Sequence, residues 1–196
     1  MNRLHCPAEL RQETLPAGPR LGLDHIDIYL LHWRGEHRLG ETVAALEELQ
    51  AAGSIRRWGV SNFDVDDMEE LVAISEDCAV NQVWYSLGER GAEFALLPWL
   101  QARRMPLMAY SPIDQGRSAR DPVLNSIAAA RGLTAVQVAL ACLLAQPGVV
   151  AIPKASRAEH LAENLTAAST TLSEGEMRAI DKHFARPLRR VPLAMN

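Results

Sequence analysis

The stretch Ile26–Leu31, with the sequence IDIYLL, is a largely apolar run that ends immediately before His32. A short apolar run of this kind predicts a buried β-strand. Four later runs have the same character and lie at Arg57–Val60, Val80–Trp84, Pro106–Tyr110 and Val149–Pro153. The sequence therefore predicts five strands.

Helical patterns separate the predicted strands. In the first pattern, Val43, Leu46 and Leu49 mark one apolar face, and Gly53 is the stop signal. The later helices are predicted to begin at Asp64, near Phe94, at Asp121–Pro122, and at the capping patterns Thr134-x-x-Gln137, Ser156-x-x-Glu159 and Ser173-x-x-Glu176. Strand and helix thus alternate, which implies an α/β fold with a parallel sheet and crossover helices. Such a sheet is either doubly wound or part of a (β/α) barrel, and the absence of GxGxxG after the first strand weakens the Rossmann interpretation.

Composition and charge exclude several classes of protein. The chain has 196 residues, 20 basic against 24 acidic side chains and a net charge of −4, which excludes a nucleic-acid binder that works by bulk electrostatics. No apolar stretch approaches the roughly 20 residues of a membrane span. The three cysteines form no CxxC pair, and HExxH does not occur, so we expect no metal site, no disulfide framework and a reducing, cytoplasmic location.

The first 20 residues differ in character from the rest of the chain. They contain three prolines, mixed charges and no hydrophobic period, which predicts an irregular or disordered segment without a signal peptide. From residue 21 the apolar periodicity begins abruptly. We therefore expect residues 21–196 to form the folded part.

Each predicted strand is followed by a side chain that can form hydrogen bonds. These side chains are His32, then Ser61 and Asn62, then Gln82 or Tyr85, then Tyr110 and Ser111, and finally Lys154. In a parallel α/β fold the carboxyl ends of the strands share one face, and ligands bind there. Five such ends in succession predict a common site.

Structural interpretations remain open beside the functional ones. They are strand capping for His32, turn chemistry for Ser61 and Asn62, backbone pairing for Gln82 and core packing for Tyr110. Ser156 is predicted to cap its helix, but a helix N-terminus also binds phosphate, so the two roles are compatible. Lys154 lies just before that helix start and is expected to face an anionic ligand.

Several motifs together resemble one known family. They are IYLLHW (residues 28–33), GVSNF (59–63), NQV (81–83), AYSP (109–112), and IPK (152–154) followed by Glu163 and Asn164. In order and spacing, over about residues 21–185, they resemble the aldo-keto reductase family, and bacterial members in particular. The resemblance implies a (β/α)8 TIM barrel that binds NADP(H) in an extended pose. With about five parallel βα units, this chain would be an incomplete barrel.

The same resemblance implies roles for individual residues in the reduction of a small aldehyde or ketone. His32 would be the catalytic residue that orients the substrate carbonyl and stabilises developing oxyanion charge, and Trp33 would line the substrate pocket. The implied cofactor contacts are Ser61, Asn62 and Gln82 for the nicotinamide carboxamide, Tyr110 for its ring, Ser111 and Ile113 for the pyrophosphate, Lys154 and Ser156 for the 2′-phosphate, and Glu163 and Asn164 for adenine. His160 stands where the family often has arginine, which leaves the preference for NADP over NAD open, although neighbouring Arg157 could compensate.

The rest of the family's catalytic set has no counterpart in the pattern. An aspartate, a tyrosine and a lysine lie upstream of the histidine strand in the family, and residues 1–20 show no such strands. Tyr29 faces away from His32 on its strand, while Tyr85 and Tyr110 have no lysine close in sequence. We therefore expect weak or no turnover from a truncated or frameshifted reductase. The alternatives are a non-catalytic nucleotide-binding fragment or a structural remnant, and open sheet edges predict self-association.

Overall fold

The computed structural model describes residues 22–195, so the predicted irregular segment 1–20 lies outside the described residues. The chain divides into two compact units, Met1–Gln82 (unit 1) and Val83–Asn196 (unit 2). Within residues 22–195 there are five strands in the order β1-β2-β3-β4-β5. Their bounds are β1 Ile26–Leu31, β2 Ile55–Ser61, β3 Asn81–Trp84, β4 Leu107–Tyr110 and β5 Val149–Ala151. The five predicted strands are confirmed, and β1–β2, β2–β3 and β4–β5 pair in parallel.

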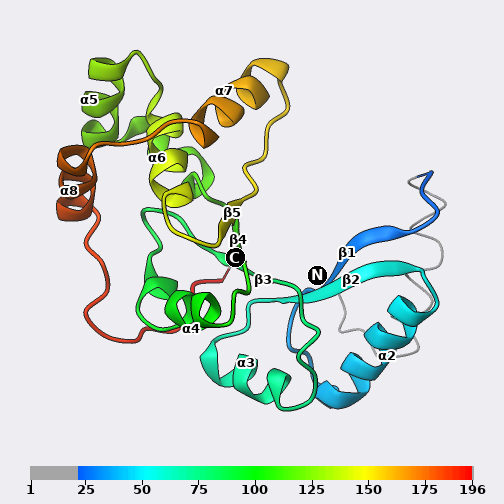
Figure 1. Cartoon of the computed structure of the whole chain (residues 1–196). Coiled ribbons are helices and arrows are strands. Elements are labelled where there is room, and N and C mark those ends of the chain that lie inside the picture. Colours follow the sequence, from blue (N-terminus) through cyan, green and yellow to red (C-terminus); the bar gives the residue numbers. More distant parts are fainter. Residues whose placement is uncertain (1–21, 196) are drawn as a thin grey trace. The chain divides into compact units, whose positions relative to one another are not determined.

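Unit 1 holds β1 and β2 with two helices, α2 (Leu39–Ala51) and α3 (Val65–Val72). Helix α2 packs against β2 and buries the predicted face of Val43, Leu46 and Leu49 (Figure 1). Helix α3 begins after the predicted cap Asp64, whose carboxylate accepts a hydrogen bond from the Val65 N–H at 2.8 Å. The fully buried core side chains of this unit include Trp58, Phe63, Met68 and Leu71.

Unit 2 is built around α6, the apolar helix predicted to be buried. Its elements are η1 Gly91–Glu93, α4 Leu96–Ala102, η2 Asp114–Arg120, α5 Pro122–Arg131, α6 Ala135–Leu144, α7 Ala158–Ala168 and α8 Glu174–His183. Helices α5 and α7 both pack on α6, and α8 packs on α5 (Figure 1). Helix α6 is buried nearly all round, and the removal of its apolar surface from water favours the folding of this unit.

Three of the predicted helix caps are confirmed in unit 2, and one is wrong. Asp121 caps α5, and Thr134 and Ser173 form reciprocal capping boxes at α6 and α8. Ser156 does not cap α7, because that helix begins one residue later than expected, with Arg157 at the N-cap and no side-chain cap hydrogen bond. From the position before the N-cap, the Ser156 hydroxyl cannot serve the first turn as a cap does.

Carboxylates at the helix ends of unit 2 make its stability depend on pH. Burial alone would raise the pKa of Asp121 and Asp181, but hydrogen bonds from Leu124 and His183 to Asp121, and from Arg90 and Arg186 to Asp181, lower both pKa values overall. The pKa of Glu176 is also lowered, first by its bonds from Ser173. A carboxyl with a lowered folded-state pKa stabilises the fold above its unfolded pKa, and this contribution is lost as the pH falls through the folded value.

We therefore expect the urea midpoint of the chain to fall steeply once the pH drops below about 4, since the unfolded state then binds more protons. Urea unfolding followed by circular dichroism between about pH 6 and about pH 3 measures this. The Asp181→Asn variant should have a lower urea midpoint than the wild type near neutral pH, and its midpoint should fall less as the pH is lowered. A wild-type midpoint independent of pH over this range would contradict the prediction.

Residues 22–195 contain neither a single membrane-spanning helix nor a cluster of metal-binding side chains. No single helix there is long and apolar enough to cross a membrane, and α5 with α6 meets the length and composition test only as a pair bent by 95°. The same residues contain no group of three or more His, Cys, Asp or Glu side chains placed to hold a metal ion.

Candidate functional site

Side chains that the sequence singled out tie the carboxyl ends of β1 and β2 to Gln82, which lies inside β3 rather than after it. Asn62 donates from its side chain to the His32 carbonyl at 3.2 Å and from its backbone to the Gln82 carbonyl at 2.8 Å. Ser61 donates its hydroxyl to the same Gln82 carbonyl at 2.9 Å. Ser61, Asn62 and Gln82 therefore form one hydrogen-bonded cluster with the backbone of His32, which we call the strand-end cluster.

The backbone at Asn62 is held in an unusual conformation. Its φ is 62°, in the left-handed region, which asparagine tolerates better than most residues. The Phe63 carbonyl just beyond it accepts a hydrogen bond at 2.8 Å from the side chain of Asn81, a fully buried residue. Asn81 belongs to the NQV motif, but the motif did not predict this structural role for it. The one feature of the sequence that could have indicated this role is that Asn81 is a polar residue inside a strand predicted to be buried.

His32 presents its side chain just past β1. The residue is exposed, while Trp33 is half-buried with its ring centroid 5.3 Å from the imidazole centroid. An exposed imidazole beside an indole can donate a hydrogen bond to a small polar molecule while the aromatic ring contacts its apolar part. This geometry suits the roles implied for the two residues.

In unit 2, the residues after β4 form a strained turn. Ser111, Asp114 and Gln115 have φ values of 49°, 53° and 53°, and Gly116 follows at 89°. Left-handed conformations at non-glycine residues each cost of the order of 1–2 kcal/mol, and strain of this kind concentrates at functional sites. Tyr110 precedes the turn, with its ring centroid 6.3 Å from that of Trp84, and Ile113 is half-buried within it.

The segment after β5 carries the basic residues. Because Ala109 pairs with Ala151, the chain leaves β4 toward Tyr110 and leaves β5 toward Lys154 at the same edge of this strand pair. Lys154 and Ser156 are exposed, and α7 begins without a side-chain cap. Its first backbone N–H groups are therefore available to an anion. Glu163 and Asn164 lie further along α7 and are half-buried.

His160 is paired with the arginine proposed to compensate for it. Arg157 Nη2 lies 2.6 Å from His160 Nε2, so this ring nitrogen is the acceptor and carries no proton in the pair. The guanidinium thus brings a fixed positive charge to the position where the family often has arginine. Both residues lie on α7 or at its start, close in sequence to Lys154.

The comparison with known proteins decides the family. The model of the aldo/keto reductase family matches residues 2–121 and 117–185. The chain belongs to this family. The match begins nearer the N-terminus than the motif resemblance, which started at about residue 21.

Relatives within the aldo/keto reductases agree with this assignment. Methylglyoxal reductase YeaE from Escherichia coli is 45% identical over 197 residues, covering 97% of this chain and 66% of that protein. Glyoxal reductase from Bacillus subtilis is 38% identical over 163 residues, covering 83% of this chain and 58% of that protein. This chain thus spans less than two thirds of the length of these curated relatives.

A solved structure confirms the fold class. The aldo-keto reductase from Klebsiella pneumoniae in complex with NADPH matches with a TM-score of 0.94 at 42% identity, covering 96% of this chain and 69% of that chain. The expected α/β fold, an incomplete (β/α)8 barrel, is therefore confirmed for this aldo/keto reductase chain.

In this aldo/keto reductase chain, the environment of Tyr85 does not suit a replacement for the absent general acid. Tyr85, the sequence alternative to Gln82, is buried, and its hydroxyl donates to Glu93 Oε1 at 2.7 Å. Burial and the neighbouring Glu93 carboxylate raise the pKa of Tyr85. A tyrosine that serves as a general acid near neutral pH needs the opposite shift, so Tyr85 does not supply this role.

Proposed function

We propose that this chain is an NADP(H)-binding part of an aldo-keto reductase that acts on small aldehydes and ketones. The strand-end cluster of Ser61, Asn62 and Gln82 beside His32 is the observation that carries the proposal. The side-chain carboxamides of Asn62 and Gln82 carry both donors and acceptors, as a nicotinamide carboxamide requires, while the buried Ser61 hydroxyl holds the Gln82 carbonyl. The bound cofactor supplies the hydride that such a reduction needs.

The residues of unit 2 have a chemistry that suits the rest of NADP(H). We assign the nicotinamide ring to Tyr110, the pyrophosphate to Ser111 and Ile113, and adenine to Glu163 and Asn164. Lys154 and Ser156 are assigned to the 2′-phosphate, supported by the uncapped start of α7 and by Arg157. Cations and helix N-terminal N–H groups together favour a dianionic group over a hydroxyl.

We assign His32 and Trp33 to the binding of the carbonyl substrate. The His32 imidazole orients the carbonyl oxygen and stabilises negative charge that develops on it, and Trp33 packs against the substrate. Because the relatives named above reduce methylglyoxal and glyoxal, we propose small dicarbonyl aldehydes as the substrate class.

We further propose that the 196 residues alone turn over weakly or not at all. The sequence has two lysines, Lys154 and Lys182, and three tyrosines, of which Tyr85 is bonded to a carboxylate. General acid catalysis contributes about 10²–10⁴-fold, so a chain without a lysine-activated tyrosine loses a factor of that size. These observations also favour the second candidate function, a nucleotide-binding module without turnover.

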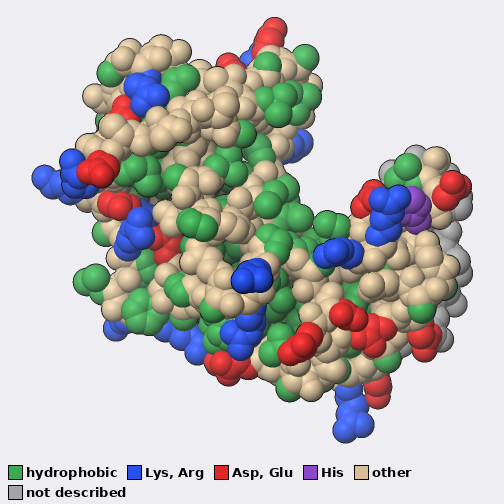
Figure 2. Space-filling view, viewed as in Figure 1, with side chains coloured by type: hydrophobic (Ala, Val, Ile, Leu, Met, Phe, Trp, Pro, Cys, Tyr) green, Lys and Arg blue, Asp and Glu red, His purple; other side chains and the backbone are tan. Residues whose placement is uncertain are grey.

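We also propose that the chain self-associates and that it is located in a reducing cytoplasm. Val150, Ile152, Leu161 and Leu165 are apolar but 41–74% exposed, and Figure 2 shows hydrophobic side chains at the surface around α7. Exposed apolar groups and strand edges favour contact with further chains. Cys78 and Cys142 are both free and buried, which suits a reducing compartment.

Three measurements on the purified chain test these proposals. Titration with NADPH should quench tryptophan fluorescence saturably, because Trp33 neighbours His32. Methylglyoxal with NADPH should be consumed about 10²–10⁴-fold more slowly than by an intact family member. Absence of saturable binding by the folded chain overturns the binding proposal, and ordinary turnover overturns the impairment. Light scattering that shows a monomer at every protein concentration contradicts the proposed self-association.

A further inference from the structure

We propose that Arg90 is the centre of a buried network of charges, called the lock, that fastens the C-terminal segment after α8 to η1, and that breaking the lock releases this segment while the rest of unit 2 stays folded. The segment comprises residues 184–192 and is called the C-terminal strap. All its contacts described below lie within unit 2. The lock is separate from the strand-end cluster and from the residues assigned to the cofactor.

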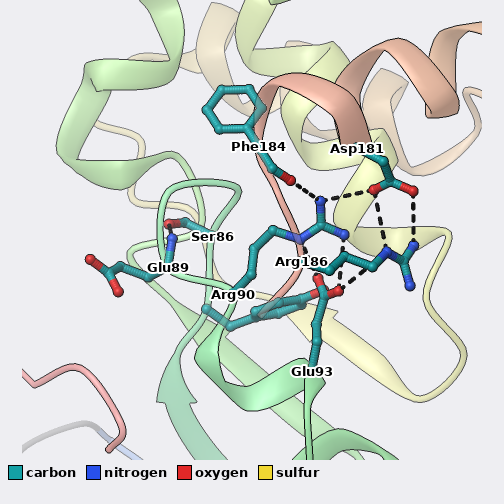
Figure 3. A network of polar contacts seen from close by, with 8 residues as sticks. Ser86, Glu89, Arg90, Glu93, Asp181, Phe184 and Arg186 are labelled. Carbon is teal, nitrogen blue, oxygen red and sulfur yellow. Dashed lines mark hydrogen bonds and ion pairs between the residues drawn. The ribbon is translucent and has the colours of Figure 1, made fainter. Parts of the chain in front are cut away.

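The Arg90 side chain joins the two elements directly. It is 4% exposed, and its Nη1 donates to Asp181 Oδ1 at 2.8 Å and to the Phe184 carbonyl at 2.6 Å (Figure 3). Its Nε and Nη2 donate to both carboxylate oxygens of Glu93 at 2.7 and 2.9 Å. One guanidinium therefore holds a bidentate carboxylate on η1 and the end of α8 at the same time.

The surrounding charges balance the buried arginine. Glu93, only 5% exposed, lies 3.6 Å from Arg186 Nε and also accepts the Tyr85 hydroxyl bond. Arg186 in turn donates to Asp181 Oδ2 at 3.2 Å. Two arginines and two carboxylates thus alternate in one network (Figure 3). A buried charge that loses its partner is strongly destabilised, so the network holds only while its members are in place.

The backbone of α8 gains a cap from this arrangement. The last carbonyl groups of a helix have no partner within the helix, and positive charge at that end is favourable. Arg90 meets both needs, since it donates to the Phe184 carbonyl at the C-cap position. The exit of the chain from α8 into the strap is therefore set by a residue of another element.

A second observation, independent of charge, places the strap on η1. A Cβ atom added to Gly91 would lie 3.0 Å from Val191 Cγ2 and 3.8 Å from the Pro192 carbonyl oxygen. The strap therefore packs closely over η1 at a residue that has no side chain. The strap thus packs on η1 at Arg90, Gly91 and Glu93.

Limited trypsin digestion tests the lock, because the strap contains the cleavable residues Arg189 and Arg190, whereas the Arg186–Pro187 bond resists trypsin. Cleavage of a locally opened segment follows its open population, so the Arg90→Met variant should be cut in the strap about tenfold faster or more. Mass spectrometry identifies the cut sites. The cut after Arg131, the last residue of α5, should remain as slow as in the wild type. The matched control is Arg178→Met, which removes an exposed ion pair with Glu174 on α8 and should leave the rate of strap cleavage unchanged.

A second variant covers the case in which Arg90→Met unfolds the whole unit. Asp181→Asn removes a charge from the lock but leaves the Arg90–Glu93 pair, and it should accelerate strap cleavage by a smaller factor. Faster strap cleavage in either folded variant supports the lock. Strap cleavage at the wild-type rate in both variants overturns it, as does cleavage in the strap and after Arg131 at one common rate in both.

Discussion

Replacing Gly59 with alanine is expected to destabilise unit 1 strongly. A Cβ atom at this position would lie 2.6 Å from the Val80 carbonyl oxygen, 2.7 Å from Val80 Cγ1 and 2.8 Å from Leu30 Cδ2. The carbonyl cannot move away at low cost, because it accepts the Val60 N–H at 3.0 Å in the pairing of β2 with β3. Overpacking costs about 1–3 kcal/mol in cores and more against backbone, so we expect a loss of about 3 kcal/mol or more.

Such a loss is a large part of the net stability of a typical domain, about 5–15 kcal/mol. Thermal or urea unfolding followed by circular dichroism measures it. Gly40→Ala is the matched control, because a Cβ atom at Gly40, near the start of α2, meets nothing within 4 Å. That variant should be as stable as the wild type or slightly more so. Equal stability of the two variants would show that the β2–β3 contact yields easily.

Replacing Lys154 with methionine is expected to weaken NADPH binding by about tenfold to a hundredfold, with little effect on NADH. This prediction rests on the proposed function. A hydrogen bond to a charged group contributes about 1.5–3 kcal/mol, which corresponds to that range of affinity. NADH has no 2′-phosphate to lose contact with, so the ratio of the two affinities is the informative quantity.

The chain offers a matched control for this experiment. Lys182 is the second of its two lysines, and it lies exposed in the last turn of α8. Lys182→Met changes the net charge equally and should leave both affinities unchanged. Fluorescence titration with each nucleotide gives the result. Equal weakening for NADPH and NADH after Lys154→Met would place the lysine elsewhere than at the 2′-phosphate.

Helix starts show where local sequence suffices and where it fails. Asp64, Thr134 and Ser173 cap the helices predicted for them, because a cap bonds backbone N–H groups within its own first turn. Ser156 has the same pattern, yet α7 begins after Arg157. Helix α7 packs on α6, and this tertiary contact competes with the local preference.

The candidate site shows the same division. The motifs identified Ser61, Asn62 and Gln82, and the structure joins them in the strand-end cluster. The support that Asn81 gives to the Phe63 carbonyl spans 18 residues, and no spacing rule connects the two. Polar residues inside strands are recognisable in a sequence, but their partners are not.

The sequence by itself determined the five strands, most helix starts and the family, because apolar periodicity, capping and contiguous motifs are local properties. Only the tertiary structure decided that Tyr85 faces Glu93, that Gly59 must lack a side chain, and that Arg90 reaches Asp181 across 91 residues. These features arise where separate segments meet. Burial and charge pairing there depend on three-dimensional neighbours rather than on neighbours along the chain.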